Sequence, residues 1–139
     1  RILTEISIMK KIGQHPNVVN MIGKAFIFHR KVYIVMELCE IGPISHLKHF
    51  KLRTPLCAYL AKETLEGLAH IHRYGFIHRD IKLSNLLLDS DGHVKIADFG
   101  LAVPDHEAKK VFCGTFRYHA PEMYNPKRTY SKKVDIWSY

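Results

Sequence analysis

The sequence predicts an α+β fold built from amphipathic helices and short antiparallel strands. Apolar residues recur at helical spacing over residues 1–12 and 55–74. Short β-rich runs lie close enough together in sequence to pair as hairpins, which favours antiparallel sheets. Hydrophobic residues make up 47% of the chain and charged residues 24%, which is typical of one globular domain and excludes a collagen-like or largely disordered protein.

The first predicted element is an amphipathic helix over Arg1 to Ile12, and Gly13 follows as its stop. The helix is expected to bury one face and to show Lys10 and Lys11 to solvent. Its apolar positions recur every three or four residues: Ile2, Leu3, Ile6, Met9 and Ile12.

A β-hairpin is expected next, after a turn at His15-Pro16-Asn17. Two β-rich stretches, Val18 to Phe28 and Val32 to Leu38, are separated by the short polar connection His29-Arg30-Lys31. Gly42-Pro43 then predicts a break in the chain.

Two helices are predicted after the break. Ser45 is expected to cap a short helix that ends near Leu52. Thr54-Pro55 combines a capping residue with a proline at the first helical position, which predicts a longer helix from Pro55 to Tyr74, ended by Gly75. The expected buried stripe of this helix is Leu56, Leu60, Leu65, Leu68 and Ile71.

The second half of the chain has shorter elements. From Asp98 to Thr129 no period is sustained, and a loop of this length inside a compact domain usually has a function. Ser131 is expected to open a final helix. Before the loop, strands are expected at Phe76-Ile77, Leu86 to Leu88 and His93 to Ala97, the last two joined by the turn Ser90-Asp91-Gly92.

Charge and cysteine content limit the classes of partner. The net charge of +8 permits a nucleic acid, but the basic residues are scattered in pairs, so we expect a solvated surface and no nucleic-acid partner. No apolar run approaches the ~18 residues that span a bilayer, so no membrane partner is expected. The three cysteines are widely separated, which favours a reduced, cytoplasmic setting over a disulfide framework.

Oxygen-bearing side chains gather around the predicted strands of the second half. Residues 78–85 read His-Arg-Asp-Ile-Lys-Leu-Ser-Asn, so Asp80 and Asn85 lie in one loop, and a hairpin carries the chain on to Asp98. These three side chains can therefore converge on one cleft, where they suit Mg²⁺ and phosphate. Taken singly, each is a solvated carboxylate or a turn residue, whereas their joint order favours a site.

The loop at 78–85 and Asp98-Phe99-Gly100 both belong to the protein-kinase signature set. Gly114-Thr115, Ala120-Pro121-Glu122 and Asp135-Ile136-Trp137-Ser138 follow in the order that the set requires. Over its whole length the sequence resembles a eukaryotic protein kinase. The resemblance implies an incomplete two-lobe fold, with the remainder of the small lobe at 1–38, the hinge and following helix at 39–53, and a truncated large lobe at 54–139.

The resemblance implies ATP and Mg²⁺ as cofactors and a protein hydroxyl as acceptor. Asp80 would receive the proton of that hydroxyl, and Lys82 would neutralise charge on the transferring phosphoryl group. Asn85 and Asp98 would hold Mg²⁺. The Asp-x-Lys form of the loop resembles serine/threonine kinases rather than tyrosine kinases.

The same resemblance implies a nucleotide pocket. Glu5 would pair with the strand lysine that holds the α and β phosphates. Met36 would lie at the back of the pocket, backbone groups of Glu37 and Cys39 would bond adenine, and Leu87 would pack under the ring. The stacked apolar spine that aligns the lobes of a kinase would consist of Met9, Met21, His78 and Phe99.

Among kinases, the segments Glu37-Leu38-Cys39, 78–88, 96–102 and Cys113-Gly114-Thr115 look most like the polo-like kinases, in the branch that controls centriole duplication. That likeness implies a location at the centrosome or centriole and partners there, held through regions outside this segment.

The sequence departs from the polo-like pattern at the activation segment. Val111 stands where those kinases have a phosphorylatable threonine, and no Ser, Thr or Tyr occurs from Leu101 to Gly114. Arg79, which normally pairs with that phosphate, is expected to find a fixed carboxylate instead, at Asp105 or Glu107. Two further departures suggest altered peptide selection, Phe116 in place of proline and His119 in place of an apolar residue.

The glycine-rich loop and the strand lysine of a kinase would precede Arg1, and the arginine that pairs with Glu122 would follow Tyr139. We therefore expect the 139 residues alone to be poorly stable and inactive, and phosphoryl transfer to belong to the parent kinase. The alternative is a catalytically incomplete fragment or a pseudokinase-like binding module. The intact Asp80, Asn85 and Asp98 argue against it, whereas a gene product that truly lacked the strand lysine would argue for it.

Overall fold

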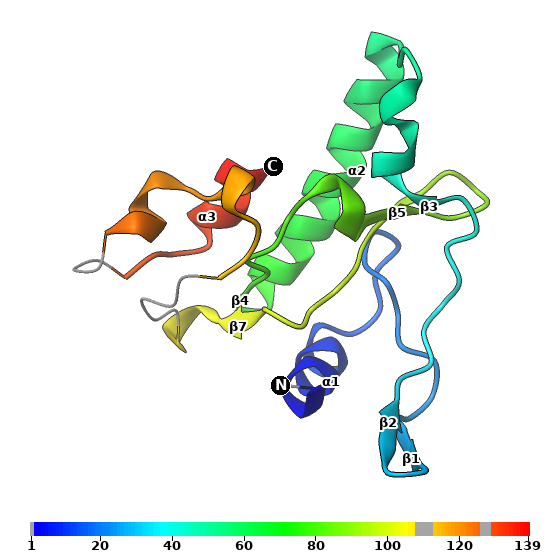
Figure 1. Cartoon of the computed structure of the whole chain (residues 1–139), viewed down its shortest axis with the longest axis vertical. Helices are drawn as coiled ribbons and strands as arrows, with labels where there is room; N and C mark the ends of the chain where they lie inside the picture. Colours follow the sequence, from blue (N-terminus) through cyan, green and yellow to red (C-terminus); the bar gives the residue numbers. More distant parts are fainter. Residues whose placement is uncertain (1, 108–112, 126–128) are drawn as a thin grey trace.

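The computed structural model describes residues 2–107, 113–125 and 129–139. The described residues form an α+β structure, as the sequence predicts (Figure 1). Its α-helices are α1 (Ile2–Ile12), α2 (Thr54–Arg73) and α3 (Lys133–Ser138). Its antiparallel sheets pair β1 (Phe26–Phe28) with β2 (Lys31–Tyr33), β5 (Leu86–Leu88) with both β3 (Gly42–Pro43) and β6 (Val94–Ile96), and β4 (Phe76–Ile77) with β7 (Val103–Pro104).

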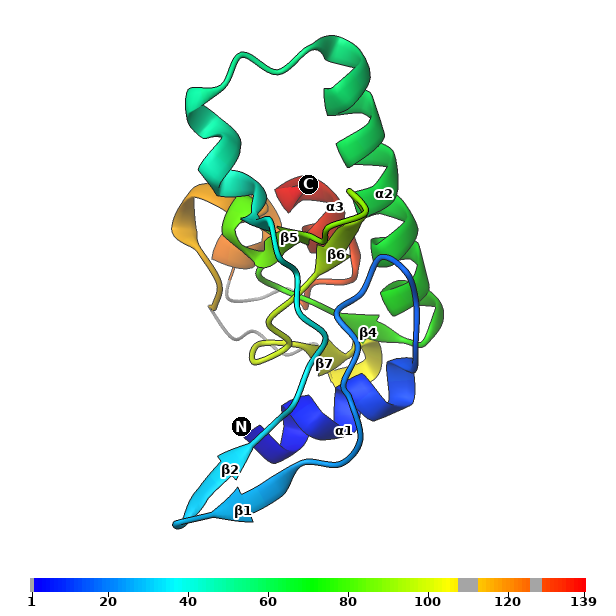
Figure 2. The same ribbon diagram turned by 90° about the vertical axis from the view of Figure 1, so that its right-hand side faces the viewer.

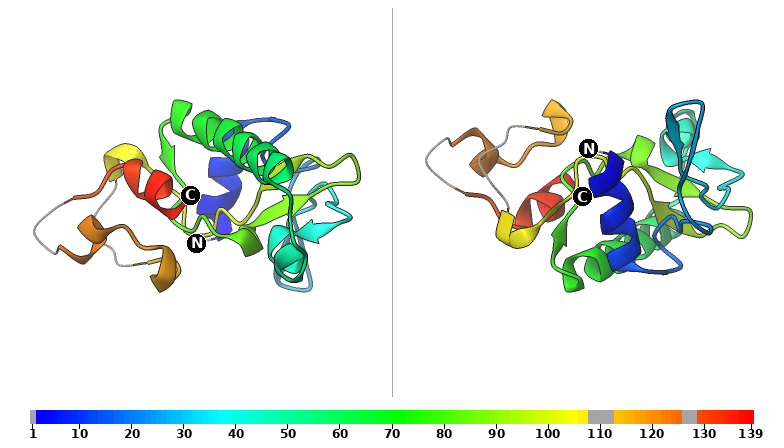
Figure 3. Two further views of the ribbon diagram at one scale, coloured as in Figure 1. Left: turned by 90° about the horizontal axis from the view of Figure 1, so that it is seen from above. Right: turned by 90° about the horizontal axis from the view of Figure 1, so that it is seen from below.

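Helix α2 runs along the molecule, with the β5–β6 hairpin beside it and α1 near its C-terminal end (Figure 2). The β1–β2 hairpin extends beyond α1 (Figure 2). Seen from above and below, α3 and the segment 113–124 lie on one side of the molecule and the β1–β2 hairpin lies on the other (Figure 3). No helix in the described ranges is both long enough and apolar enough to cross a membrane.

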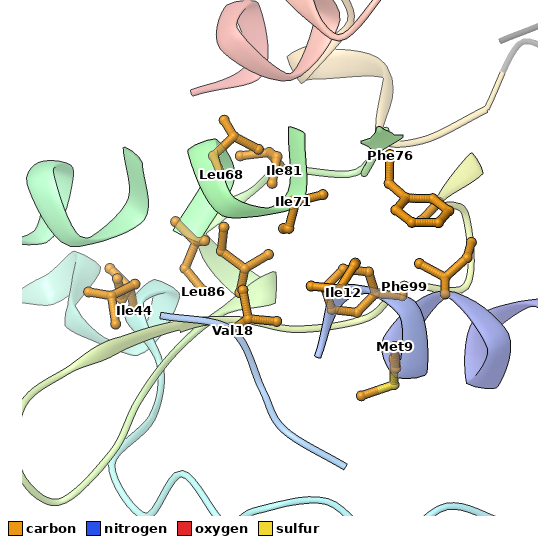
Figure 4. Close-up of a cluster of buried hydrophobic side chains, with 14 of the residues drawn as sticks. Met9, Ile12, Val18, Ile44, Leu68, Ile71, Phe76, Ile81, Leu86 and Phe99 are labelled. Carbon is orange, nitrogen blue, oxygen red and sulfur yellow. The ribbon is translucent and has the colours of Figure 1, made fainter. Parts of the chain in front are cut away.

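The main hydrophobic core forms where α1, α2 and the β5–β6 hairpin meet (Figure 4). Each fully buried leucine or isoleucine there contributes about 1.5–3 kcal/mol relative to an exposed side chain. The most deeply buried members are Ile12, Leu68, Ile71, Ile81, Val94, Ile96 and Phe99. The core therefore joins the first helix to the strands that flank the predicted site.

The buried face of α2 differs in part from the predicted stripe. Leu60, Leu68 and Ile71 are buried as predicted, but Leu56 and Leu65 are 42% and 40% exposed. Leu56 lies in the first turn of α2, which extends past the β5–β6 hairpin in Figure 1. Leu65 points away from the buried face of α2. Two polar residues, Glu63 and Thr64, lie on the buried face instead, and both are hydrogen-bonded there.

The predicted helix caps are wrong at both Ser45 and Thr54. A 3₁₀ helix, Ile44–His49, follows Pro43 without a side-chain cap, and Gly42-Pro43, predicted as a break, forms β3. Thr54 is the first residue of α2 and makes no capping hydrogen bond. Since Pro55 has no N–H, the first turn has one donor fewer to satisfy.

The first hairpin is confirmed, but its regular strands are shorter than predicted. Hydrogen bonds continue beyond β1 and β2, from Ile22 N–H to the Val35 carbonyl at 2.7 Å and from Glu37 N–H to the Asn20 carbonyl at 3.0 Å. Lys31, predicted as part of the connection, belongs to β2. After the hairpin the chain runs into β3.

The segment between α1 and the hairpin is attached to β6. Val19 N–H donates to the Ile96 carbonyl at 2.9 Å, and Ile96 N–H donates to the Asn17 carbonyl at 3.0 Å. Val18 and Ile96 form a parallel bridge. These bonds tie the N-terminal third of the chain to the strand that leads into Asp98.

The long loop predicted from Asp98 to Thr129 contains ordered elements. Strand β7 pairs with β4, and 3₁₀ turns occur at Asp105–Glu107, Phe116–Tyr118 and Pro121–Tyr124. A second buried cluster of Ile77, Ala120, Tyr130 and Val134 holds this segment. The final helix begins at Lys133, two residues after Ser131. Arg1 and Val111, on which two of the expectations fall, lie outside the described residues.

Candidate active site

Asp135, in the first turn of α3, holds the backbone of the loop that carries Asp80. The Asp135 carboxylate is buried and accepts the backbone N–H groups of His78 at 2.9 Å and Arg79 at 2.8 Å. His72 of α2 lies 2.8 Å from the same carboxylate. The sequence marked Asp135 as part of a motif but not as the anchor of this loop, because the contact spans more than fifty residues.

Arg79 has a left-handed backbone conformation, with φ of 68°. Its Nε donates to the Leu101 carbonyl and its guanidinium Nη1 to the Tyr130 hydroxyl, both at 2.7 Å. The expectation that Asp105 or Glu107 pairs with Arg79 is wrong in this structure. Asp105 is held beside β4 by its own N–H bond to Gly75, and the carboxylate of Glu107 lies 3.8 Å from His106.

The Asp80 carboxylate is buried and receives three donors. Lys82 Nζ lies 2.8 Å from Oδ2, Thr115 Oγ1 donates to Oδ1 at 2.7 Å, and Asn85 Nδ2 donates to Oδ2 at 3.0 Å. Burial acts to raise the pKa of Asp80, but the hydrogen bonds from Lys82, Thr115 and Asn85 outweigh it and leave the pKa below its usual value. Asp80 is therefore ionised at neutral pH.

The side chains of Lys82 and Thr115, which both contact Asp80, are also hydrogen-bonded to each other. Lys82 Nζ also donates to Thr115 Oγ1 at 2.9 Å. The ammonium group is thus held within one hydrogen bond of the carboxylate, where it can meet negative charge that arrives beside Asp80. The sequence placed Thr115 in a motif, but gave it no role in the site.

Asn85 directly precedes β5 and Asp98 follows β6, so both lie at the open end of the β5–β6 hairpin, where the Ala97 N–H donates to the Asn85 carbonyl at 2.9 Å. The Asn85 amide nitrogen is engaged with Asp80, so its Oδ1 is the atom left for a ligand. Asp98 is exposed, has φ of 65°, and accepts the Gly100 N–H at 3.1 Å. One amide oxygen and one exposed carboxylate are hard donors that fit Mg²⁺.

His78 and Phe99 join the site to the core. Their ring centroids are 5.2 Å apart with the planes at 69°, an edge-to-face contact. Phe99 and Met9 belong to the main core (Figure 4). Met21 packs against this core. Of the expected spine, the contact between His78 and Phe99 is thus observed directly.

The segment predicted as the hinge leads directly into β3. Glu37 uses its carboxylate internally, accepting the Asn20 N–H at 2.6 Å and pairing with buried Lys95 at 2.9 Å. Its N–H is bonded to Asn20, so its backbone carbonyl is the group left for a base. Met36 is 46% exposed.

Leu87 lies beside the hinge segment, because its β5 position pairs with Pro43 of β3. It is half-buried, on the sheet face opposite to buried Leu86 and Leu88. Cys39 precedes this pair, and its carbonyl accepts the Gly42 N–H at 3.1 Å. Glu5 lies one turn before Met9 on α1 and is half-buried.

The site thus combines an anchored loop, an ionised aspartate and two oxygen donors at the open end of one hairpin. The whole chain, residues 1–139, matches the family model of the protein kinase domain. The chain belongs to the protein kinase family. Members of this family generally bind ATP with Mg²⁺ and act on protein substrates.

Curated relatives match nearly all of the chain. It is 43% identical over 141 residues to a probable cell cycle serine/threonine-protein kinase, CDC5 homolog, of Encephalitozoon cuniculi, covering 97% of this chain and 29% of the relative. It is 40% identical over 141 residues to the serine/threonine-protein kinase MST20 of Pyricularia oryzae, covering 99% and 15%. It is 41% identical over 138 residues to the mitogen-activated protein kinase kinase kinase 1b of Physcomitrium patens, covering 96% and 18%. The chain spans less than a third of each of these relatives.

Proposed function

We propose that the protein carrying this chain transfers the γ-phosphoryl group of ATP to serine or threonine hydroxyls of other proteins. The observation that carries this proposal is the Asp80 carboxylate, which is ionised, buried and fixed by Lys82, Thr115 and Asn85. The names of the relatives, which are serine/threonine-protein kinases, support it.

The proposed reaction uses Asp80 as the proton acceptor. As the substrate oxygen attacks the γ-phosphorus, its proton passes to the Asp80 carboxylate, the new P–O bond forms, and the bond to the ADP oxygen breaks. The Lys82 ammonium, 2.8 Å from Asp80, offsets negative charge on the transferring group. Asp135 keeps the loop rigid by holding the N–H groups of His78 and Arg79.

Asn85 and Asp98 would hold Mg²⁺ in this proposal, since they supply hard oxygen donors at the open end of one hairpin. Mg²⁺ held there would supply positive charge that offsets the negative charge of the phosphates. The carbonyl of Glu37 and the backbone of Cys39 would bind adenine, with Met36 behind and Leu87 beneath the base. Glu5 would orient the lysine that holds the α and β phosphates.

At the level of the branch, we propose a polo-like kinase that acts in the cytoplasm and at the centriole. The motifs at 37–39, 78–88, 96–102 and 113–115 support this, and one relative bears a cell-cycle name. A fluorescently tagged parent protein is expected to coincide with a centriole marker. A diffuse distribution throughout the cell cycle would contradict the branch.

The activity is tested on the intact parent protein with radiolabelled ATP, Mg²⁺ and an equal mixture of Ser, Thr and Tyr acceptor peptides. We expect label on Ser and Thr, and a loss of about 10²–10⁴-fold in kcat for Asp80→Asn, because the proton acceptor is removed. The matched control is Asp91→Asn, the same change at an exposed turn carboxylate, which should retain full activity. Wild-type protein that binds ATP without transferring phosphate would instead be a pseudokinase-like binding module.

A further inference from the structure

Residues 113–115, which end the activation segment, pack against the loop at 78–85 that carries Asp80. The Cys113 side chain lies beside that of Tyr130, which also holds Arg79. Gly114, with φ of +97°, passes so close to the Arg79 carbonyl that a Cβ would collide with it. Thr115 donates to Asp80 at 2.7 Å. The end of the segment thus lies against residues 79 and 80 throughout.

Tyr130 is the side chain that completes this docking. It is 5% exposed and belongs to the buried cluster with Ile77, Ala120 and Val134. Its hydroxyl accepts from the Arg79 guanidinium at 2.7 Å, while the Leu101 carbonyl accepts from Nε of the same group. A hydrogen bond from a charged donor is among the stronger ones in a protein. Tyr130 therefore fixes the head of Arg79 from a rigid, buried position.

The part of the activation segment from Leu101 to Gly114 contains no residue whose phosphorylation could provide a partner for Arg79. From Leu101 to Gly114 the chain contains no Ser, Thr or Tyr. Neither Asp105 nor Glu107 makes an ion pair with Arg79 in the described structure. In the described part of the chain, the hydrogen bonds of the Arg79 side chain go to the Leu101 carbonyl and to the Tyr130 hydroxyl.

We propose that Tyr130 is a positioning residue that replaces an activation-segment phosphate: it holds Arg79, and through Arg79 the Asp80 loop, in the catalytic arrangement without modification of the segment. This inference rests on the proposed kinase activity and concerns the regulation of the same site. It predicts a kinase that is active as synthesised.

The experiment compares Tyr130→Phe with wild type in the intact parent protein. The variant removes one oxygen atom and leaves the buried ring, so the fold is expected to persist. We expect kcat to fall about tenfold or more, because Arg79 loses a charge-assisted hydrogen bond, while KM for ATP stays unchanged. The matched control is Tyr74→Phe, the same change at a tyrosine that is 51% exposed, and it should leave kcat unchanged.

A double mutant separates positioning from general destabilisation. If Tyr130 acts through Arg79, then adding Tyr130→Phe to Arg79→Ala lowers kcat no further, whereas a purely structural effect adds to it. Treatment of the wild-type kinase with a broad-specificity protein phosphatase should leave kcat unchanged, and this arm does not depend on any variant folding.

The outcomes distinguish the two proposals. Wild-type protein without phosphoryl transfer refutes the proposed function. An active wild type refutes only this inference if Tyr130→Phe keeps full kcat, if the double mutant is additive, or if phosphatase treatment abolishes activity.

Discussion

His78 has a protonation state that its two hydrogen bonds define. Its Nε2 lies 3.0 Å from the Ala97 carbonyl, so this nitrogen donates, and its Nδ1 accepts the Asp80 N–H at 3.3 Å. Only the neutral ring, with its proton on Nε2, can make both bonds. Complete burial lowers the pKa of His78, which agrees with a neutral ring. The backbone next to the proposed proton acceptor thus depends on an uncharged imidazole.

This arrangement predicts a loss of stability on acidification. The folded pKa is lowered, so below the unfolded value of about 6.5 the unfolded chain binds a proton that the folded chain does not, and stability falls as pH drops. The pKa of His15 is also lowered, chiefly by burial, and contributes with the same sign. Thermal unfolding of the kinase domain from pH 7.5 to 5.5 should show a falling midpoint.

The variant His15→Asn removes the contribution of His15 to the pH dependence of the unfolding midpoint. The decrease of the midpoint that remains in this variant is expected to come from His78. A control, His106→Gln, changes an exposed ring and should preserve the whole slope. A midpoint that stays constant over this range would show that His78 titrates at its ordinary pKa in the folded domain.

At the level of single residues, the sequence predicted best where functional groups are contiguous. Asp80, Lys82 and Asn85 share one short loop, and the structure joins them by direct hydrogen bonds. Thr115 and Tyr130 complete the same network from distant segments. The motif that contains Thr115 does not identify its hydrogen-bond partner, and no periodicity or spacing marks Tyr130, so the sequence alone could not assign these contacts.

Helix α2 depends on Gly67 for its approach to the turn after α1. A Cβ at this position would collide with the Asn17 carbonyl and lie 3.1 Å from Ile96 Cδ1. Asn17 in turn donates to the buried Glu63 carboxylate at 2.6 Å and to the Val94 carbonyl at 3.0 Å. Helix, turn and strand are therefore packed with no room for a methyl group.

Gly67→Ala is expected to destabilise the kinase domain, although alanine is the better helix former. The gain in helix propensity is about 1 kcal/mol. Overpacking against fixed backbone typically costs about 1–3 kcal/mol, so the net change is a loss of up to about 2 kcal/mol. Urea unfolding of the two proteins measures the difference.

The matched control for this helix is Ala69→Gly, at an exposed position two residues further on. It reports the propensity effect alone and should cost about 1 kcal/mol. If Gly67→Ala instead raised the unfolding midpoint, the close contact with Asn17 would not exist in solution.

Among the elements, the sequence predicted those with a local signal. The spacing of apolar residues identified α1 and α2, and turn residues identified the β5–β6 hairpin. Strands β3 and β7 have two residues each and pair with partners far along the chain. Each contains a proline, which reads locally as a break, so only tertiary pairing makes them strands.

On the scale of the molecule, the described chain exposes many large apolar side chains. Ile27 and Leu38 are 76% and 77% exposed in the N-terminal third, and Phe116 and Trp137 are 73% and 61% exposed at the other side. Exposed apolar surface of this extent marks contact regions in a larger assembly or a tendency to associate.

The 139 residues alone are therefore expected to self-associate and to lack kinase activity. Size-exclusion chromatography at several protein concentrations, with an assay of each fraction, measures both properties. The parent protein serves as the control for the assay. A monomer that unfolds cooperatively and phosphorylates peptide would contradict this expectation.

The backbone bonds of Asn17 and Val19 to Ile96 bear on how this polypeptide could be divided. Residues 1–38, which the sequence assigns to the small lobe, include a stretch that is hydrogen-bonded to Ile96 of β6. A cut in the exposed region around Ile41 would therefore not yield two autonomous halves. Each fragment would expose the backbone groups that pair with the other fragment. The two fragments, when co-expressed, are therefore expected to associate and form the same hydrogen bonds.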